Sequence, residues 1–145
     1  MAILTTGVGS GTSGYQGATQ GSVLSQSFKI GAGQTTLTFD YDVVSEEPHE
    51  YVGSSYDDKF YAELVLENGT VIRLVEESVN KSTWYSVSGI DFEGGDKTVY
   101  HTKWKTFNFD VSKYQNQRVT IRFVVYDVGD SSWDTAALID NVKLN

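Results

Sequence analysis

The sequence predicts an all-β domain built as a two-sheet antiparallel β-sandwich. Three observations favour this class: apolar side chains that alternate with polar ones, turn-forming residues between the alternating segments, and no segment with helical periodicity. The 145 residues are enough for one sizeable core, and 39% of them are hydrophobic. Alternation alone leaves the choice between an immunoglobulin-like sandwich and a jelly roll open.

The first 22 residues differ in composition from the rest of the chain. They are rich in Gly, Ser and Thr, and the first charged side chain of the protein is Lys29. This composition is typical of a linker or a loose loop. We therefore expect residues 1–22 to form a lead-in with one possible strand, and residues 23–145 to form the sandwich.

Six later segments alternate with the period of two that half-buried strands show. In the first of them, Leu37, Phe39, Tyr41 and Val43 share one face, which predicts that they point into the core. The six segments are 36–44, 59–67, 70–77, 104–111, 118–128 and 136–144. Asn68-Gly69 lies between the second and the third and predicts a two-residue hairpin turn of type I′.

Two long stretches, about residues 45–57 and 79–103, show no strand character. The first is acidic and aromatic, and the second is rich in Ser, Gly, Trp and Tyr. Long loops on a rigid sandwich are a common place for binding residues. We therefore expect function to reside in these two stretches.

The formal net charge is −8 and the pI is about 4.6. Nucleic acids and anionic membrane surfaces need basic partners, so both are excluded as the expected ligand. The sequence has no apolar run of the length of about 18 residues that spans a membrane. Residues 1–4 lack the features of a signal peptide, which suggests a module cut from a longer protein or a mature chain with an added Met.

Acidic side chains gather in two segments. Residues 40–63 hold eight of the nineteen and residues 127–140 hold four, while Lys59 is the only Lys or Arg in either segment. If the two segments meet in space, a cation has to relieve their repulsion. Ca²⁺ takes oxygen ligands from irregular loops, whereas Zn²⁺ prefers Cys or His, and the chain has no Cys and only two His.

Asp140 is singled out by the phase of the last segment. Leu138, Val142 and Leu144 share one face of a regular strand, and Asp140 lies on that same face. A carboxylate on a core face is costly unless it is paired or coordinates a metal. The phase therefore predicts that Asp140 is either a buried metal ligand or an acid at the strand edge beyond the core.

Two blocks of sequence resemble a known family. These are "TLTFDYDVVSEEPHEYVGSSYDDKFYAELV" and "VVYDVGDSSWDTAALIDNVKL", preceded by "GATQGSVLSQSFKI". They resemble a calcium-binding jelly-roll module of bacterial surface proteins and adhesins, which is similar in fold to carbohydrate-binding modules. The resemblance covers most of the chain but not residues 79–103. One departure is Glu46-Glu47, where the family pattern often has Asn-Glu.

The resemblance implies a jelly-roll β-sandwich supported by Ca²⁺, in an exported, multidomain cell-surface protein. It also implies a set of acids that either bind the metal or fix the loops. These candidates are Glu47, Glu50, Asp58, Asp127, Asp130, Asp134 and Asp140. The ligand of such a module is not implied.

Aromatic side chains in or beside the loops are candidates for ligand binding. Flat aromatic faces stack on sugar rings, and neighbouring acids accept hydrogen bonds from hydroxyls. The candidates are Tyr51, Tyr56, Trp84, Trp104 and Trp133. The alternative is that some of them, Tyr56 and Trp133 above all, pack over metal-binding loops as lids.

Motifs that indicate catalysis are missing from the sequence. It contains no G-x-S-x-G, no H-E-x-x-H and no phosphate-binding loop. We therefore expect a non-catalytic, calcium-binding adhesion module that contacts a glycan or a peptide through its loops. The alternatives are a calcium-rigidified spacer in a long surface protein and, less favoured, a polysaccharide hydrolase that uses a pair of acids.

Overall fold

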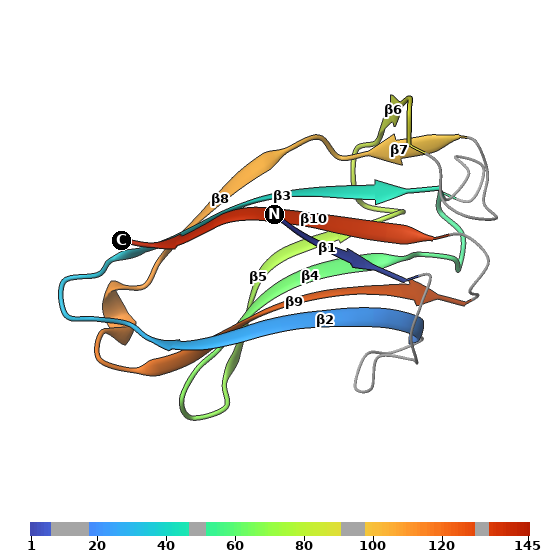
Figure 1. Cartoon of the computed structure of the whole chain (residues 1–145). Coiled ribbons are helices and arrows are strands. Elements are labelled where there is room, and N and C mark those ends of the chain that lie inside the picture. The colour runs from blue at the N-terminus through green and yellow to red at the C-terminus, as the bar shows by residue number, and fades with distance from the viewer. Residues whose placement is uncertain (7–17, 47–51, 91–97, 130–133) are drawn as a thin grey trace.

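A computed structural model describes residues 1–6, 18–46, 52–90, 98–129 and 134–145, and it confirms the all-β class. Two antiparallel sheets face each other along the length of the molecule (Figure 1). In the described part of the chain, the only helical element is a single 3-10 turn over Ser112–Tyr114. No described helix has the length and apolar character needed to cross a membrane.

The six strands of the first sheet are β1 (Ala2–Thr5), β3 (Thr36–Ser45), β6 (Tyr85–Val87), β7 (Val99–His101), β8 (Lys105–Asp110) and β10 (Thr135–Leu144). The four strands of the second sheet are β2 (Ala18–Lys29), β4 (Lys59–Val65), β5 (Val71–Ser78) and β9 (Arg118–Val128).

The strand order shows the sandwich to be of the predicted jelly-roll type. The first sheet runs β1-β10-β3-β7-β6, with β8 also paired to β3, and the second runs β2-β9-β4-β5. The chain passes between the sheets at several connections, from β2 to β3, from β3 to β4 and from β9 to β10. Strands that are adjacent in the sequence therefore face each other across the core, as in jelly rolls.

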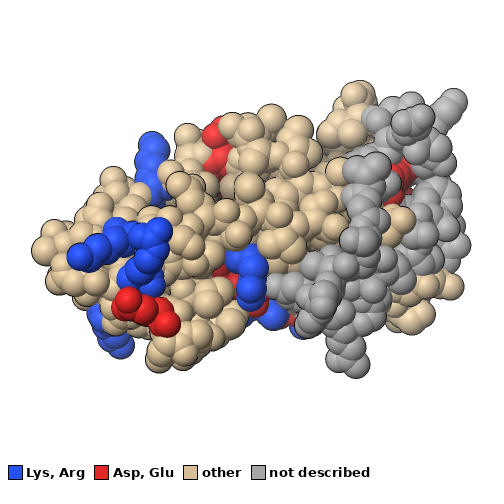
Figure 2. Space-filling model, turned by 60° about the horizontal axis from the view of Figure 1, so that its bottom comes forward, with Lys and Arg blue, Asp and Glu red and all other residues tan. Residues whose placement is uncertain are grey.

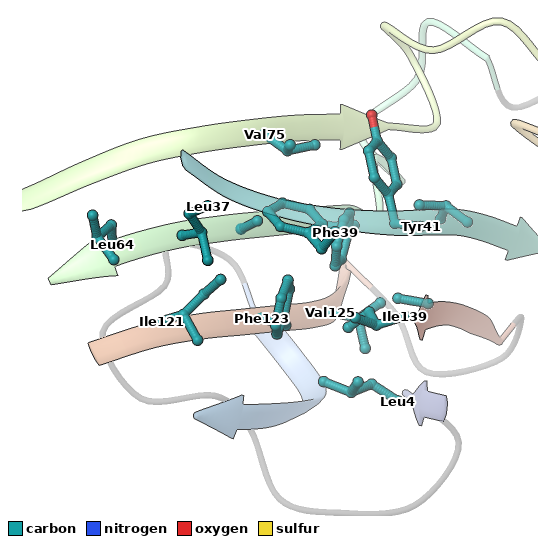
Figure 3. Packing of buried hydrophobic residues seen from close by; sticks show 14 of the residues in the cluster. Leu4, Leu37, Phe39, Tyr41, Leu64, Val75, Ile121, Phe123, Val125 and Ile139 are labelled. Carbon is teal, nitrogen blue, oxygen red and sulfur yellow. The ribbon is translucent and has the colours of Figure 1, made fainter. Parts of the chain in front are cut away.

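The core lies between β3 on one side and β4 and β9 on the other (Figure 3). Phe39 is fully buried, and its ring meets the ring of Phe123 edge-on at a centroid distance of 5.1 Å. Leu37, Tyr41 and Val43 belong to the same cluster, which confirms the predicted inward face of 36–44. Each such side chain contributes about 1.5–3 kcal/mol through burial.

The hairpin between β4 and β5 is confirmed, but the predicted turn type is wrong. The Gly69 N–H donates to the Leu66 carbonyl at 2.9 Å, and Gly69 has φ +87°. Asn68 does not share the positive φ that a type I′ turn requires at both central residues. The turn is instead centred on Glu67 and Asn68, and Gly69 follows it in the left-handed conformation.

Two short strands, β6 and β7, lie inside the stretch 79–103 that showed no strand character. Each has three residues, and β7 pairs with β3 only at Val44↔His101 and Ser45↔Tyr100. Three residues are too few for an alternation to be recognised. The strands β7 and β8 follow one another along the same edge of β3.

The predicted phase of the last strand is wrong. Ala137 and Ile139 are 0% and 2% exposed and belong to the core, whereas Val142 is 45% exposed. The register with β3 shifts between Asp140 and Lys143, and Asn141 there has φ +52°. Because of this irregularity, Leu144 lies on the core side again. An alternation that is counted back from Leu144 and ignores the irregularity assigns every residue before it to the wrong face.

Strand β2 begins inside the predicted lead-in and extends twelve residues to Lys29. It pairs with β9, and β1 pairs with β10. The sequence of β2 alternates weakly because Ser, Gln and Gly occupy many of its positions. An edge strand buries few side chains on either face, so it needs few apolar residues. For this reason the sequence of residues 23–29 did not predict a strand.

Candidate functional site

Four acidic residues gather at one end of the sandwich, where four strands begin or end. Glu46 follows β3, Asp58 precedes β4, Asp127 is near the end of β9 and Asp134 precedes β10. The register pairs Lys59 with Tyr126 and Thr135 with Ser45, which brings these strand ends together (Figure 1). We call Glu46, Asp58, Asp127 and Asp134 the acidic end. The predicted convergence of the two acidic segments is therefore present in the described residues.

Asp58 joins three strands at the acidic end. It is 2% exposed; its Oδ1 accepts a hydrogen bond from the Val128 N–H at 3.0 Å and its Oδ2 accepts one from the Thr135 hydroxyl at 2.8 Å. Its carbonyl accepts the Val79 N–H at 3.1 Å. Asp58 therefore ties the start of β4 to β9 and, across the core, to β10, as a loop-fixing acid would.

The Thr135 hydroxyl at this carboxylate has two further hydroxyl-bearing residues as partners, and none of the three was among the predicted site residues. The Thr135 hydroxyl also contacts the Ser45 hydroxyl at 3.0 Å, and the Thr135 N–H donates to the Thr6 hydroxyl at 3.0 Å. All three residues are buried. Ser and Thr are common strand residues, so the sequence carries no signal that separates these three from the others.

Asp127 has a strongly perturbed carboxyl group at the acidic end. Its side chain is fully buried, and burial first and the neighbouring Asp58 carboxylate second raise its pKa to about 9. A hydrogen bond from Thr6 acts in the opposite direction, and Asp134 adds a smaller upward shift of the pKa. Two carboxyl groups in contact inside a protein repel each other when both are ionised, so one of them keeps its proton or a cation binds between them.

Glu46 and Asp134 link the ends of β3 and β10. The Asp134 N–H donates to Glu46 Oε1 at 3.2 Å, and the Glu46 N–H donates to the Asp134 carbonyl at 3.1 Å. Glu46 is 1% exposed, and burial raises the pKa of Asp134. Glu46 was counted among the acids of its segment but not among the candidate ligands, and its burial adds it to the set.

The seven predicted metal-site acids divide into three groups. Asp58, Asp127 and Asp134 belong to the acidic end. Asp140 lies apart: it is six residues beyond Asp134, about 20 Å along a strand, its side chain is 44% exposed, and it is 3.4 Å from the Met1 ammonium group. Asp140 is therefore not buried, which contradicts the first predicted alternative and agrees with the second, an acid at the strand edge beyond the core. Glu47, Glu50 and Asp130 lie outside the described residues.

The donor atoms of the acidic end suit a hard cation. They are carboxylate and hydroxyl oxygens, which Ca²⁺ prefers, and no His belongs to the set. Within the described ranges, no group of three or more acids and histidines is arranged closely enough to hold a metal ion by itself. A full coordination shell therefore needs further oxygens, and residues 47–51 and 130–133 connect directly to Glu46 and Asp134 in the sequence.

Other buried acids of the sandwich contact basic side chains. Glu63 is 3.4 Å from Arg73 and 3.3 Å from Arg122. Asp42 accepts hydrogen bonds from Thr102 at 3.1 Å and contacts His101 Nδ1 at 2.8 Å. His101 of β7 therefore contacts Asp42 of β3.

The predicted aromatic residues occupy different environments. Tyr56 is half-buried, and its ring lies 3.1 Å from the place where a Cβ on Gly129 would be, next to the acidic end. Trp84 packs against the core, and its indole N–H donates to the Val79 carbonyl at 3.1 Å. Trp104 is 48% exposed. Tyr51 and Trp133 lie outside the described residues.

Two exposed aromatic residues lie near the place where β7 leads into β8: Tyr85 on β6, and Trp104 after β7. Tyr85 of β6 is 43% exposed, and the Lys103 ammonium lies 3.9 Å from the centre of its ring. Trp104 follows Lys103 directly, and Lys103 has φ +66°. We call Tyr85, Lys103 and Trp104 the aromatic corner. Sequence reasoning selected Trp104 but not Tyr85, although Tyr85 lies in the same loop-rich stretch.

The geometry defines a β-sandwich with an acidic end and an aromatic corner. No model of a protein family matches the chain, and no curated protein matches it. Among solved structures, a CBM27-1 module of Caldicellulosiruptor saccharolyticus, described in complex with mannohexaose, is similar at 15% identity and a TM-score of 0.41, over 88% of this chain and 66% of that chain. A structure described as CBM4 is similar at 14% identity and a TM-score of 0.40, over 99% of this chain and 93% of that one. Similarity at this level says nothing of this chain's ligand, which has to be argued from its own residues.

Proposed function

We propose that this chain is a non-catalytic, calcium-stabilised binding module of an exported surface protein, and that it contacts a glycan through the aromatic corner. The observation that carries the proposal is the burial of Asp127 against Asp58, which raises the pKa of Asp127 to about 9. Bound Ca²⁺ replaces the proton that this pair otherwise requires and neutralises the charge of the neighbouring acids.

The residues that would hold the ion are Asp127 and Asp134, with Glu46 beside them. Asp58 already accepts two hydrogen bonds from the protein, so we assign it the role of fixing β4 to β9 and β10. The other proposed ligands are Glu47, Glu50 and Asp130. The ion would stabilise the ends of four strands and the loops between them, and it carries no catalytic role in this proposal.

The aromatic corner supports the glycan part of the proposal. Exposed aromatic rings can stack on a sugar ring, and an ammonium group beside them can donate hydrogen bonds to the sugar hydroxyls. Trp104 and Tyr85 are the exposed aromatic side chains that carry this role, whereas Trp84 contributes to the core. A peptide with aromatic or acidic side chains is the second ligand class that this corner fits.

Thermal unfolding with and without Ca²⁺ tests the calcium site. A ligand at about 100 times its dissociation constant stabilises a protein by about 2.7 kcal/mol. For a domain of this size that corresponds to a rise in Tm of about 10 °C. We expect Ca²⁺ to produce this rise, Mg²⁺ to produce a smaller one, and EDTA to reverse it. An unchanged Tm at millimolar Ca²⁺ would refute the site.

A glycan array tests the ligand. We expect binding that Trp104→Ala reduces at least tenfold and that EDTA weakens. Val71→Ala is a matched control, because Val71 is also exposed, at 47%, but lies at the start of β5. Equal loss in both variants would show that the corner is not the binding surface.

The alternative is a calcium-rigidified spacer. The hydrogen bonds of Asp58 favour it, because they give the acidic end a structural role that needs no ligand. The two functions separate in one experiment: a Ca²⁺-dependent rise in Tm together with an array free of binding supports the spacer, and binding lost in Trp104→Ala supports the binding module.

A further inference from the structure

In the described residues, three basic side chains lie over the ring of a tyrosine. The three pairs, with the distance from the cationic group to the centre of the ring, are Arg73 and Tyr61 at 3.4 Å, Lys105 and Tyr41 at 5.9 Å, and Lys103 and Tyr85 at 3.9 Å. Two of the three cations also contact an acid. Arg73 is 3.4 Å from Glu63, and Lys105 is 2.6 Å from Glu77. These two pairs are therefore sets of a cation, a tyrosine ring and a carboxylate.

The third pair, at the aromatic corner, has no such carboxylate. Within the described part of the chain, the lysines that form ion pairs with acidic side chains are Lys59, Lys81 and Lys105. Lys103 is exposed and is not among them. Asp42 on the neighbouring strand is already engaged: its Oδ2 contacts His101 Nδ1 at 2.8 Å, and its Oδ1 accepts a hydrogen bond from the Thr102 hydroxyl at 3.1 Å. The Tyr85 ring therefore holds an ammonium group to which the described residues supply no acid.

Other cations of the surface differ from Lys103 in one of two ways. Figure 2 brings forward the side that lies at the bottom of Figure 1, and basic side chains there adjoin acidic ones. Glu63, for example, contacts both Arg73 and Arg122, at 3.4 and 3.3 Å. Lys113 is exposed and forms no ion pair in the described residues, but no aromatic ring orders its ammonium group. Lys103 combines an ordered ammonium group with the lack of an acidic partner, which suits an external carboxylate.

The backbone of Lys103 is held in a left-handed conformation. Its φ of +66° is unfavourable for most side chains, and Gly or Asn adopts it at a lower cost. Thr102 fixes this geometry, because its N–H donates to the Val43 carbonyl at 3.0 Å and its hydroxyl accepts a hydrogen bond from the Val43 N–H at 3.1 Å. An unfavourable conformation that the surrounding structure maintains points to a functional position. The chain therefore has a lysine where Gly or Asn would be more stable.

We infer that the aromatic corner binds sugar acids, in which a carboxylate is attached to the sugar ring, and that Lys103 recognises this carboxylate. The inference rests on the proposed glycan-binding function and names the class of its ligand. The Lys103 ammonium group donates a charge-assisted hydrogen bond to the carboxylate. Trp104 is the next residue in the chain and is 48% exposed, so its ring can stack on the sugar that carries the carboxylate. The bound ligand completes the set of cation, tyrosine ring and carboxylate that Arg73 and Lys105 already have.

The net charge of −8 does not prevent an acidic glycan from reaching Lys103. Exposed charges that are more than about 8 Å apart are largely screened at physiological salt. Glu46 of the acidic end lies four residues beyond Asp42, which is about 13 Å along an extended chain. Val44 pairs with His101, and because β7 is antiparallel to β3, the chain that follows runs away from Glu46 toward Lys103. The acidic end is therefore largely screened from the aromatic corner.

An array of oligosaccharides of glucuronic, galacturonic and sialic acid tests the inference on the wild-type chain. Each oligomer is printed beside its methyl ester, which keeps the sugar ring and removes the charge, and polyglutamate serves as the peptide arm. We expect an acid form to bind at least about tenfold more tightly than its ester, with a smaller ratio in 1 M NaCl. Equal binding of acids, esters or neutral glycans that Trp104→Ala abolishes would overturn this inference and leave the glycan-binding function standing. Polyglutamate binding as tight as that of the sugar acids would overturn the sugar-acid class, and an array without any binding would overturn both.

Lys103→Asn tests the assigned residue, because it removes the ammonium group and suits the left-handed backbone. We expect the Tm not to fall, and the affinity for the acid form to drop at least about tenfold, to that of the ester. Lys113→Asn is the matched control: it removes the same charge at an exposed position of the 3-10 turn and should leave the affinity unchanged. A Lys103→Asn variant that still prefers the acid to the ester, or an equal loss of affinity in both variants, would overturn the role of Lys103.

Discussion

Two buried carboxyl groups, Glu77 in β5 and Asp127 in β9, have pKa values shifted in opposite directions. Glu77 is 7% exposed and accepts hydrogen bonds from the Tyr41 hydroxyl at 2.9 Å, from Lys105 Nζ at 2.6 Å and from the Ser82 hydroxyl. Burial alone would raise the pKa of Glu77, but these bonds, that of Lys105 first, hold it below its usual value. For Asp127, burial and then Asp58 raise the pKa to about 9.

The difference lies in the neighbours that each strand supplies. The wall of the sandwich brings a lysine and two hydroxyl groups to Glu77, so this acid is ionised and stabilises the fold. At the acidic end, the neighbour that shifts the pKa of Asp127 most is a second aspartate. In the described part of the chain, the buried acids Glu63 and Glu77 have cationic neighbours, whereas acids lie beside one another at the acidic end. This contrast supports the proposal of a cation site there.

The largest expected effect is the loss of Glu77. Glu77→Ala removes the acceptor of the Tyr41 hydroxyl, which is itself buried, and leaves Lys105 without its partner. We expect the free energy of unfolding to fall by about 2–4 kcal/mol. Urea denaturation measures it, with Glu76→Ala as the control: Glu76 pairs with Lys81 at 3.1 Å but is 34% exposed, so its loss should cost below about 1 kcal/mol. Equal losses in the two variants would contradict the assigned role of Glu77.

Asp127→Asn should act in the opposite direction in the absence of metal. The amide has the shape of the protonated acid and requires no proton, so we expect the metal-free variant to gain about 1–3 kcal/mol at pH 8. The same variant should lose most of the rise in Tm that Ca²⁺ produces in the wild type. Unfolding in EDTA and in millimolar Ca²⁺ tests both statements. A variant that is destabilised in EDTA and still responds fully to Ca²⁺ would remove Asp127 from the site.

The pH dependence of stability should show both acids with opposite signs. The folded pKa of Asp127 lies above its unfolded value, so its contribution is fully present below pH 4 and is lost as the pH rises toward about 9. The folded pKa of Glu77 is depressed, so its contribution is present above pH 4.5 and is lost as the pH falls below it. In EDTA we expect stability to decline from pH 5 to pH 9 by no more than about 1.4 kcal/mol per pH unit, the limit for one proton. Asp127→Asn should flatten this decline, and a wild-type profile that is already flat would contradict the raised pKa.

Sequence patterns predicted the core of this fold because the buried strands alternate without interruption. Leu37, Phe39 and Tyr41 face inward as their period requires. The pattern failed where a local backbone feature breaks the period: the irregularity at Asn141 inverted the face assigned to Asp140. The pattern of polar and apolar residues does not show that one residue has a left-handed conformation, so the change of face at Asn141 could not be detected from the sequence.

The acidic end was predictable in part for a different physical reason. Clusters of acids are visible in the composition of a segment, which located the two acidic segments, and the family resemblance then pointed to Asp58, Asp127 and Asp134 within them. The neighbouring hydroxyl groups could not be selected, since Thr6, which follows β1, and Ser45 of β3 meet Thr135 only in the folded chain. Two partners of other buried acids, Arg122 of Glu63 and His101 of Asp42, are also remote in sequence, so composition alone could not assign them.

The smallest expected effect on stability is that of removing the charge of Lys105 while its aliphatic stem is kept. Lys105→Met keeps the aliphatic stem near the Tyr41 ring, whose centre lies 5.9 Å from the ammonium group, and removes the charge. The lysine side chain is 41% exposed, so solvent screens its interaction with Glu77, and we expect a loss of about 1 kcal/mol at low salt that shrinks in 1 M NaCl. Lys113→Met, at an exposed lysine of the 3-10 turn, should change stability by less than about 0.5 kcal/mol.

Lys105→Met could instead leave stability unchanged at every salt concentration. In that case the hydrogen bonds from the Tyr41 and Ser82 hydroxyls are sufficient to keep Glu77 in its carboxylate form. The contrast with Asp127 would then rest on hydrogen-bond donors, not on a cation, and an added donor near Asp127 would replace Ca²⁺ as the means to stabilise the acidic end.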